Sequence, residues 1–353
     1  MAAKGKVNEL IQALNDVCLE KGIEPEIIFE ALEVALVAAY KKNFASAQNV
    51  AVNIDKNTGA FGVFAQKTVV EEIEEEMGQY QITLDDARKM SGSYEIGDVV
   101  DIEVTPKNFG RIAAMTAKQI VTQRIREAER GIIYSEYTEK LNDIVSGSIQ
   151  RIERGNVFVD IGKIEAILPL NEQPVSERED YKIHQIIQCY VSEVKNGTRG
   201  TQIVLSRTHP GLVKKLFIKE VPEIADGIVE IKSIAREAGS RTKIAVYSAD
   251  KNVDPQGACI GHNGSRVQVI GDVLGEEKID IVKWSEDPVE FITESLSPAK
   301  VLKTEINEEE KSAKVVVPDH QLSLAIGKSG QNVRLAVRLT GWKIDIVSDL
   351  AGA

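Results

Sequence analysis

The spacing of apolar residues predicts two helices at the start of the chain, within residues 5–44. Leu10 and Leu14 recur at helical spacing in the first of them, which ends at Gly22. Pro25 is expected to open the second helix, because proline fits the first turn, where a backbone N–H is not needed. The chain therefore begins with two helices in this interpretation.

A second pattern follows, in which apolar and polar residues alternate in two runs around Asn57-Thr58-Gly59. This alternation on both sides of a turn signal is typical of a β-hairpin. The acidic run Glu71–Glu76 is then expected to be a solvated edge or loop. From Phe109 to Arg130 the spacing returns to that of a long amphipathic helix. The residues predicted to share its apolar side are Ile112, Met115, Val121, Ile125 and Ala128.

From about residue 140 the sequence pattern changes to short apolar runs separated by turn signals. The runs are DIVSGSIQRI, NVFVDIG, EAILP, IIQCYVSEV and TQIVLS. They predict a small closed barrel of the OB type. In the second run Val157, Val159 and Ile161 share one face, so Phe158 points the other way. Phe158 is then either a platform for a stacked nucleic-acid base or a side chain buried under the loop of residues 171–185, and the pattern leaves both open.

The rest of the chain contains an internal repeat. GACIGHNGSRVQVIGDVLGEEKIDIV (Gly257–Val282) aligns with SLAIGKSGQNVRLAVRLTGWKIDIV (Ser323–Val347). Both copies have Ile-Gly-x-x-Gly, a predicted helix after it and Lys-Ile-Asp-Ile-Val, and each follows a predicted strand. This is the pattern of the KH module, whose Gly-x-x-Gly loop clamps single-stranded nucleic acid by its backbone. Two KH modules are therefore predicted behind the barrel.

The two glycine loops differ in charge. The first has no full positive charge at neutral pH, and Arg266 is expected to supply one. The second carries a lysine, and Arg334 and Arg338 follow it on one helical face. We expect the second loop to bind RNA more strongly, the alternative for the first being a KH fold that packs but barely binds. The predicted RNA-binding residues are Gly261, His262, Asn263, Gly264, Arg266, Gly327, Lys328, Ser329, Gly330, Arg334, Arg338 and, in the barrel, Phe158.

Catalytic chemistry finds no support in the sequence. The Gly327-Lys328-Ser329 triplet resembles a nucleotide-hydrolase phosphate loop, but such a loop needs a glycine where Leu322 stands. The 3 cysteines and 4 histidines show no disulfide framework and no metal-ligand spacing. No paired histidine and carboxylate or nucleophile elbow occurs. A binding protein without catalytic residues, cofactor or metal is expected.

The net charge of −11 argues at first against a nucleic-acid partner, yet the charge is unevenly distributed. Residues 1–135 carry 15 basic and 21 acidic side chains, so the front part holds most of the excess acid. Within it, Lys107, Arg111 and Lys118 stand in a stretch without acid, either as a plain exposed face or as a contact for RNA or an acidic partner. The longest apolar run, ALEVALVAAY, is too short for a membrane span. A monomeric cytoplasmic protein without a membrane partner is expected.

Over essentially its whole length the chain resembles the NusA family of bacterial transcription elongation factors. The stretches that carry the resemblance are VTPKNFGRIAAMTAKQIVTQRIREAERG, GKIEAILPLNEQ, SRTHPGLVKKLF, EVPEIADGIVEIKSIAREAGSRTKIAV, DPVEFITESLSPAKV and PDHQLSLAIGKSGQNVRLAVRLTGWKIDI. The resemblance implies a multidomain α+β protein with an N-terminal α/β domain that binds RNA polymerase (1–135), an S1-type OB-fold barrel (136–207) and two tandem KH domains of the prokaryotic, type II topology (208–285 and 286–349).

The same resemblance implies partners and a role. They are core RNA polymerase near its RNA exit channel, nascent single-stranded RNA and other Nus factors, with effects on pausing, intrinsic termination and antitermination. Lys107, Arg111 and Lys118 are the candidate residues for the protein partner. Some family members carry acidic repeats after the second KH module that contact the polymerase α subunit, and this sequence is expected to be a short form without them.

Two other classes combine similar modules. A phosphorolytic exoribonuclease joins KH and S1-type modules in the opposite order behind a large catalytic core, for which this chain has no room. A ribosome-bound KH protein fits the repeat but gives the acidic front domain no role. The transcription factor is therefore the preferred interpretation.

Overall fold

In the computed structural model the described residues are 16, 18–19, 24–44, 49–56, 58–197 and 200–352. The first predicted helix lies, apart from isolated positions, outside these ranges, as does Asn57. The chain divides into two compact units, Met1–Ile132 and Ile133–Ala353. Each unit has hydrophobic cores of its own.

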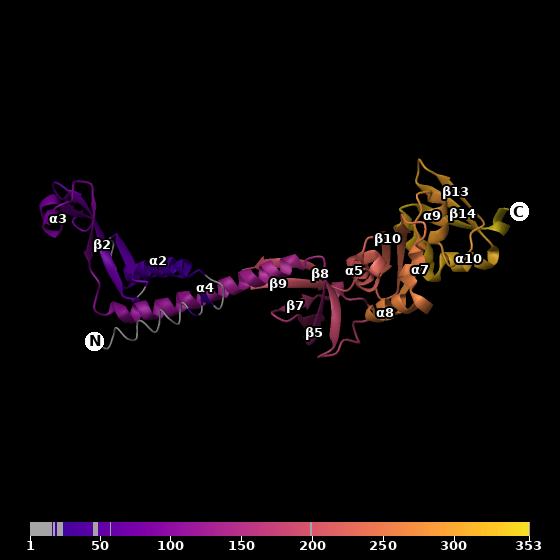
Figure 1. The fold of residues 1–353 in the computed structure, drawn as a ribbon, viewed down its shortest axis with the longest axis horizontal. Helices are drawn as coiled ribbons and strands as arrows, with labels where there is room; N and C mark the ends of the chain where they lie inside the picture. The colour runs from indigo at the N-terminus through magenta and orange to yellow at the C-terminus, as the bar shows by residue number, and fades with distance from the viewer. Residues whose placement is uncertain are drawn as a thin grey trace. The chain divides into compact units, whose positions relative to one another are not determined.

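The first unit consists of a helix packed beside a four-stranded sheet (Figure 1). Helix α2 (Pro25–Phe44) begins at the predicted proline and buries Ile28, Leu32 and Leu36. The predicted hairpin is confirmed as β1 (Val50–Ile54) and β2 (Phe61–Val70), which pair antiparallel. Strand β3 (Gln81–Thr83) pairs with β2 in parallel and β4 (Val99–Glu103) pairs with it antiparallel.

The outer end of this sheet forms a smaller second core. The acidic run Glu71–Glu76 lies exposed between β2 and β3, as predicted. Helix α3 (Leu84–Met90) starts where the Thr83 hydroxyl accepts a hydrogen bond from the backbone N–H of Asp86. Its Ala87 is buried with Val69 and Val100.

Helix α4 (Phe109–Glu139) runs past the predicted end at Arg130 and contributes to both units. Phe109 and Ala113 are buried in the core of the first unit. Tyr137 is buried in the barrel core of the second unit, and its hydroxyl donates to the carbonyl oxygen of Ile161 (2.9 Å). The placement of Met115 on the apolar side was wrong: its side chain is 76% exposed. The buried stripe follows Phe109 and Ala113, which leaves Met115 on the opposite side of the helix.

The five predicted strands form a closed barrel of order β5-β6-β7-β9-β8 at the start of the second unit. They are β5 (Ile144–Glu153), β6 (Asn156–Asp160), β7 (Glu165–Leu168), β8 (Ile186–Gly197) and β9 (Gly200–Ser206). A short 3₁₀ turn, η1 (Leu170–Glu172), follows β7. Val157 and Val159 face the barrel core together with Leu205, as the alternation in β6 predicts.

Each copy of the repeat folds as helix, two strands, two helices and a strand, which is the predicted type II KH topology. In both, the first two strands are antiparallel and the second and third are parallel. The first module comprises α5 (Pro210–Glu220), α6 (Pro222–Ala225), β10 (Val229–Glu237), β11 (Arg241–Ser248), α7 (Pro255–Ile260), η2 (His262–Gly264), α8 (Ser265–Val273) and β12 (Lys278–Lys283). The second comprises α9 (Pro288–Ser295), β13 (Lys303–Asn307), β14 (Ser312–Val317), α10 (Asp319–Ile326), η3 (Lys328–Gly330), α11 (Gln331–Thr340), β15 (Lys343–Ser348) and η4 (Asp349–Gly352).

A buried ion pair joins the barrel to the first KH module. Arg207 is 5% exposed and donates two hydrogen bonds to the carboxylate of Glu177 (2.5 and 2.7 Å). It also donates to the carbonyl oxygens of Gln188 in β8 (2.7 Å) and of Val273 in α8 (2.9 Å). The Arg207 side chain, directly after β9, thus binds both the barrel and the first KH module.

The sheet of the first KH module packs against helices α9 and α11 of the second. The apolar residues in this contact are Ala235, Ala245, Val282, Phe291, Leu335 and Leu339. Lys243 is fully buried there; its Nζ donates to the carbonyl oxygen of Ser297 (2.8 Å) and lies 3.1 Å from the Asp280 carboxylate. Burial lowers the pKa of Lys243, while Asp280 favours its charged form. The two KH modules therefore share a core.

Candidate nucleic-acid interface

The loop of the second KH module connects α10 to α11. Gly327 ends α10 with φ 75° and ψ 170°, and Ser329 follows with φ 52° and ψ 31°. Gly330 has φ 74° and ψ 16°, and its N–H donates to the carbonyl oxygen of Gly327 (3.1 Å). Glycine adopts such positive φ values readily, whereas serine does so rarely. The loop is thus a tight turn that leaves Lys328 and Ser329 exposed.

The loop of the first module has nearly the same backbone. Gly261 has φ 74° and ψ 176°, Asn263 has φ 51° and ψ 30°, and Gly264 has φ 78° and ψ 12°. The closing bond from the Gly264 N–H to the Gly261 carbonyl oxygen is 3.2 Å long. The difference between the two loops therefore lies in their side chains and not in their backbone conformation.

The two glycines of each loop are needed for different reasons. A Cβ on Gly327 would lie 2.7 Å from the backbone nitrogen of Asn332, so a side chain there collides with α11. A Cβ on Gly330 would meet its nearest atom at 4.0 Å, and one on Gly264 at 3.9 Å. The last glycine therefore borders open space, into which the backbone of a ligand could approach.

The residue five positions after the first glycine secures each loop to the preceding helix. In the second module this is Asn332, whose side-chain amide donates to the carbonyl oxygens of Leu296 and Ala325 (both 3.0 Å). In the first module it is Arg266, which donates to the carbonyl oxygen of Ala258 (2.6 Å) and pairs with Glu223 (2.8 Å). The Arg266 guanidinium thus faces the protein, and its contact with RNA stays a prediction.

Arg334 lies beside the second loop. Its Nη1 donates to the carbonyl oxygen of Ser329 (3.1 Å), one residue before the last glycine. Its Nε and Nη2 donate to the carboxylate of Glu237 in β10 of the first module (2.6 and 3.2 Å). Arg338 lies one turn along α11, 4.0 Å from the same carboxylate. The two arginines share one face, as predicted, but they share it with an acid that the sequence pattern did not indicate.

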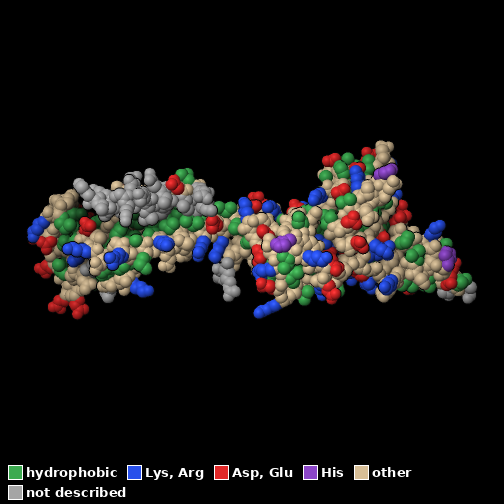
Figure 2. Space-filling view, turned by 90° about the horizontal axis from the view of Figure 1, so that it is seen from below, with side chains coloured by type: hydrophobic (Ala, Val, Ile, Leu, Met, Phe, Trp, Pro, Cys, Tyr) green, Lys and Arg blue, Asp and Glu red, His purple; other side chains and the backbone are tan. Residues whose placement is uncertain are grey.

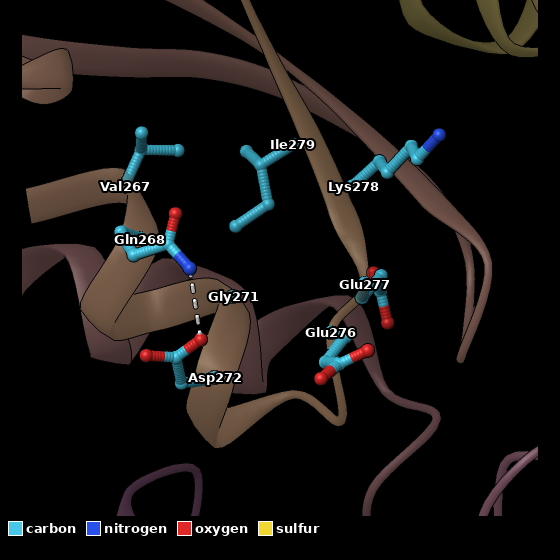
Figure 3. A pocket seen from close by; sticks show the side chains of 8 residues that line it. All are labelled: Val267, Gln268, Gly271, Asp272, Glu276, Glu277, Lys278 and Ile279. Atoms are coloured by element: carbon cyan, nitrogen blue, oxygen red, sulfur yellow. Dashed lines mark hydrogen bonds between the residues drawn. The ribbon is translucent and has the colours of Figure 1, made fainter. Parts of the chain in front are cut away.

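A hollow of about 430 Å³ lies between β12 and α8, the helix that follows the first loop (Figure 3). Val267 and Ile279 line one end of it, whereas Asp272 and Glu276 lie at the other. The side-chain amide of Gln268 donates to the Asp272 carboxylate (3.1 Å). Gln268 and Asp272 carry no signal in the repeat, because the aligned positions of the second copy hold different residues. Hydrogen-bond acceptors dominate the rim, which suits base edges better than phosphates.

Phe158 lies on the outer side of the barrel, half-buried, as the alternation in β6 predicts. The guanidinium carbon of Arg151 in β5 lies 3.6 Å from the centre of its ring. Arg151 is in turn held by Glu165 through two hydrogen bonds (3.1 and 2.7 Å). A base that stacks on Phe158 would have to displace Arg151 or stack on its guanidinium plane. The role of Phe158 in RNA binding stays a prediction.

Lys107, Arg111 and Lys118 are all exposed in the first unit, the last two on α4. Arg111, Met115 and Lys118 are spaced four and three residues apart, so they share one helix face. This face, Arg111–Met115–Lys118, therefore presents an apolar side chain between two cations. Met and Arg are enriched where one protein contacts another, whereas Lys is depleted there.

Charges on the remaining surface are mixed. On the face shown in Figure 2, basic and acidic side chains are interspersed and do not gather in one continuous basic patch. Within the described ranges no three or more His, Cys, Asp or Glu side chains are arranged to hold a metal ion. Among the same residues, no helix combines the length and the apolar character needed to cross a bilayer. The three cysteines are free and buried, and burial raises the pKa of Cys259 to about 12.

A closed OB-type barrel followed by two KH modules with open glycine loops defines a protein of the single-stranded nucleic-acid-binding class. Family comparisons agree in each part of the chain. Residues 9–131 match the NusA N-terminal domain, and residues 139–207 match the S1 RNA binding domain. Residues 207–284 and 288–351 match the NusA-like first and second KH domains.

The chain is 56% identical to the transcription termination/antitermination protein NusA of Halalkalibacterium halodurans, covering 97% of this chain and 88% of that one. It is likewise 56% identical to the protein of that name from Bacillus subtilis, covering 97% of this chain and 91% of that one. The solution structure of the N-terminal domain of NusA from B. subtilis is 54% identical and covers 35% of this chain and 98% of that one, with a TM-score of 0.32. The chain belongs to the NusA family.

Proposed function

We propose that this chain is a transcription factor that binds RNA polymerase and nascent single-stranded RNA and acts in termination and antitermination. The observation that carries the proposal is the pair of glycine loops, which hold one backbone conformation in two tandem KH domains. The names of the relatives support the role in transcription. The proposal gives the chain a binding role in the cytoplasm and no catalytic step.

RNA is proposed to follow the two loops. Open space beside Gly264 and Gly330 would let phosphates approach the backbone N–H groups and the N-termini of α8 and α11. The second loop is proposed as the stronger contact because Lys328 adds a full positive charge. The hollow between α8 and β12 would accept a base through Gln268 and Asp272.

RNA polymerase is proposed to bind the front domain. We place this domain at residues 1–135, the barrel at 136–207 and the KH domains at 208–285 and 286–349. The Arg111–Met115–Lys118 face supports the assignment, because it offers an exposed apolar side chain flanked by cations. The acidic excess of this part of the chain makes RNA a poor partner for it.

The RNA contact is tested by changing Lys328 and Ser329 together to Asp. This places two negative charges where phosphates are proposed to lie, in an exposed loop that adds little to the core. Weaker binding of a fluorescent single-stranded RNA is expected, by about tenfold or more for two charge-assisted contacts. Fluorescence anisotropy measures the affinity, and the melting temperature is expected to stay unchanged.

The matched control is Lys42→Asp with Asn43→Asp, which changes the net charge equally on the exposed end of α2. This control should bind RNA almost as the unaltered chain does. Equal or tighter RNA binding by the loop variant would refute the proposed role of the second loop.

A further inference from the structure

Glu237 lies at the end of β10, and its carboxylate is surrounded by hydrogen-bond donors of the second KH module. Arg334 donates twice (2.6 and 3.2 Å), and the Gln331 side-chain amide donates once (2.9 Å). Arg338 completes the group at 4.0 Å. Gln331 is the first residue of α11, directly after Gly330. The carboxylate therefore lies beside the last glycine of the loop, near the positive end of a helix.

This set of donors is the one that a phosphate group would use. Two guanidinium groups and an amide, next to a helix N-terminus and a Gly-x-x-Gly loop, match the geometry with which proteins bind phosphate oxygens. Arg334 and Arg338 remain 44% and 54% exposed, whereas Glu237 is 21% exposed. The cations are thus accessible to a ligand from outside while the acid holds them from within.

The KH fold itself does not require an acid here. The β13–β14 hairpin of the second module has Asn307 at the register position that corresponds to Glu237 in β10. The contact between the two modules does not rest on Glu237 alone. It is also made by Lys243, which reaches Ser297, and by the apolar residues around Phe291 and Leu335.

We propose that Glu237 acts as an internal substitute for an RNA phosphate, which single-stranded RNA must displace from Arg334 and Arg338. The inference rests on the proposed RNA binding by the second loop. In the free protein the acid keeps both arginines extended and oriented at the loop. When RNA binds, a phosphate replaces the Glu237 carboxylate beside the arginines. The free energy gained from this phosphate contact is reduced by the loss of the ion pair between Glu237 and the arginines. Affinity for RNA is thereby held below what the cations alone would give.

The Glu237→Gln variant tests this proposal. It removes the competing charge and leaves a side chain of the same shape. We expect RNA binding about two- to fivefold tighter, the range that an exposed ion pair contributes. The RNA phosphate contacts the same two arginines in both proteins, so the slope of log affinity against log salt should stay close to that of the unaltered chain. Replacing a residue that only joined the modules would weaken RNA binding instead.

Three further variants complete the test. Glu305→Gln, which removes an equal charge from the β13 pair with Lys303, should leave RNA affinity and slope unchanged. With Arg334 and Arg338 both changed to Gln, adding Glu237→Gln should give no further effect. Glu237→Asp keeps the charge on a shorter side chain and should bind RNA with intermediate affinity, even if the Gln variant folds poorly.

The outcomes separate this inference from the proposed function. If the unaltered chain fails to bind RNA, the proposed function is wrong. If it binds, and neither Glu237→Gln nor Glu237→Asp binds more tightly, Glu237 is not a competitor of phosphate and the inference is overturned.

Discussion

Glu177 and Arg207 show how single residues join domains in this chain. Both are almost fully buried, and between them they contact the barrel strand β8 and helix α8 of the first KH module. The Tyr181 hydroxyl also donates to Glu177 (2.7 Å). A charge removed from water in this way is tolerated only while its partner remains.

Replacing Glu177 by Gln should therefore destabilise the second unit strongly. The change leaves Arg207 buried without its counter-ion, which costs about 3–5 kcal/mol of unfolding free energy. Denaturant unfolding of the intact chain measures the loss. Replacing both residues by Met should recover most of it, since a buried ion pair can often be exchanged for apolar packing.

The exposed pair Lys89–Asp86 provides the control for this prediction. Its two side chains are 75% and 56% exposed, so Lys89→Gln should leave the unfolding transition unchanged. If Glu177→Gln is equally harmless, the buried pair does not hold the barrel and the KH module together.

The sequence could not have indicated the loss of stability expected from replacing Glu177, because residue type alone does not reveal burial. Glu177 stands in the polar stretch 171–185 that the sequence pattern treats as a loop. Arg266 is a similar case: its position two residues after the loop suggested RNA, whereas its contacts are to Glu223 and Ala258. In both, the partner is distant in sequence and only the fold brings it near.

At the scale of elements, the two glycine loops are an internal comparison. They share their dihedral angles but differ in the pair between the glycines, His262-Asn263 against Lys328-Ser329. Changing the first pair to Lys-Ser should therefore strengthen RNA binding without altering the loop backbone. One additional phosphate contact should make the log–log salt slope more negative by about 0.7. A salt titration of RNA binding by anisotropy measures it.

The Asn263→Ser variant alone is the control, since it changes the backbone preference but not the charge. It should bind RNA as the unaltered chain does. If the Lys-Ser variant also leaves the salt slope unchanged, the first loop does not contact phosphate.

Secondary-structure elements were predicted more accurately from the sequence than side-chain contacts were. The hairpin, the five barrel strands and both KH modules follow from alternation and repetition, which depend on local pattern. The end of α4 was missed because its last turns are held by packing of Ile133 and Tyr137 in the barrel core, a contact that the local pattern does not reveal. The pairing of Arg334 with Glu237, 97 residues away, has no local signature.

At the scale of the whole molecule, the two units are expected to divide the two partners. A fragment of residues 1–132 should retain RNA polymerase without binding RNA, and a fragment of 133–353 should do the reverse. The cut lies before Ile133 because this residue and Tyr137 pack in the barrel core. Joined in one chain, each contact raises the effective concentration of the other, so the intact protein should engage transcribing complexes far better than either fragment.

Retention of the fragments on immobilised core RNA polymerase measures this division. The Arg111→Glu, Lys118→Glu variant of the 1–132 fragment serves as the specific control and should be retained poorly. Retention of 133–353 alone would show that the front domain has been assigned to the wrong partner.

The contact between the KH modules has a consequence for assembly. It joins unlike surfaces, a sheet on one module and helices on the next, and such head-to-tail contacts can in principle repeat without limit. The sheet of the second module contains the same Lys-Ile-Asp-Ile-Val strand as the sheet of the first. The helices of a KH module from another copy of the chain could therefore pack against it in the same way. However, the register places Glu305 where the first module has the buried Ala235, and Lys303 accompanies it on the outer face. These charges would have to lose their water on contact, which disfavours a repeat of this contact on the sheet of the second KH module.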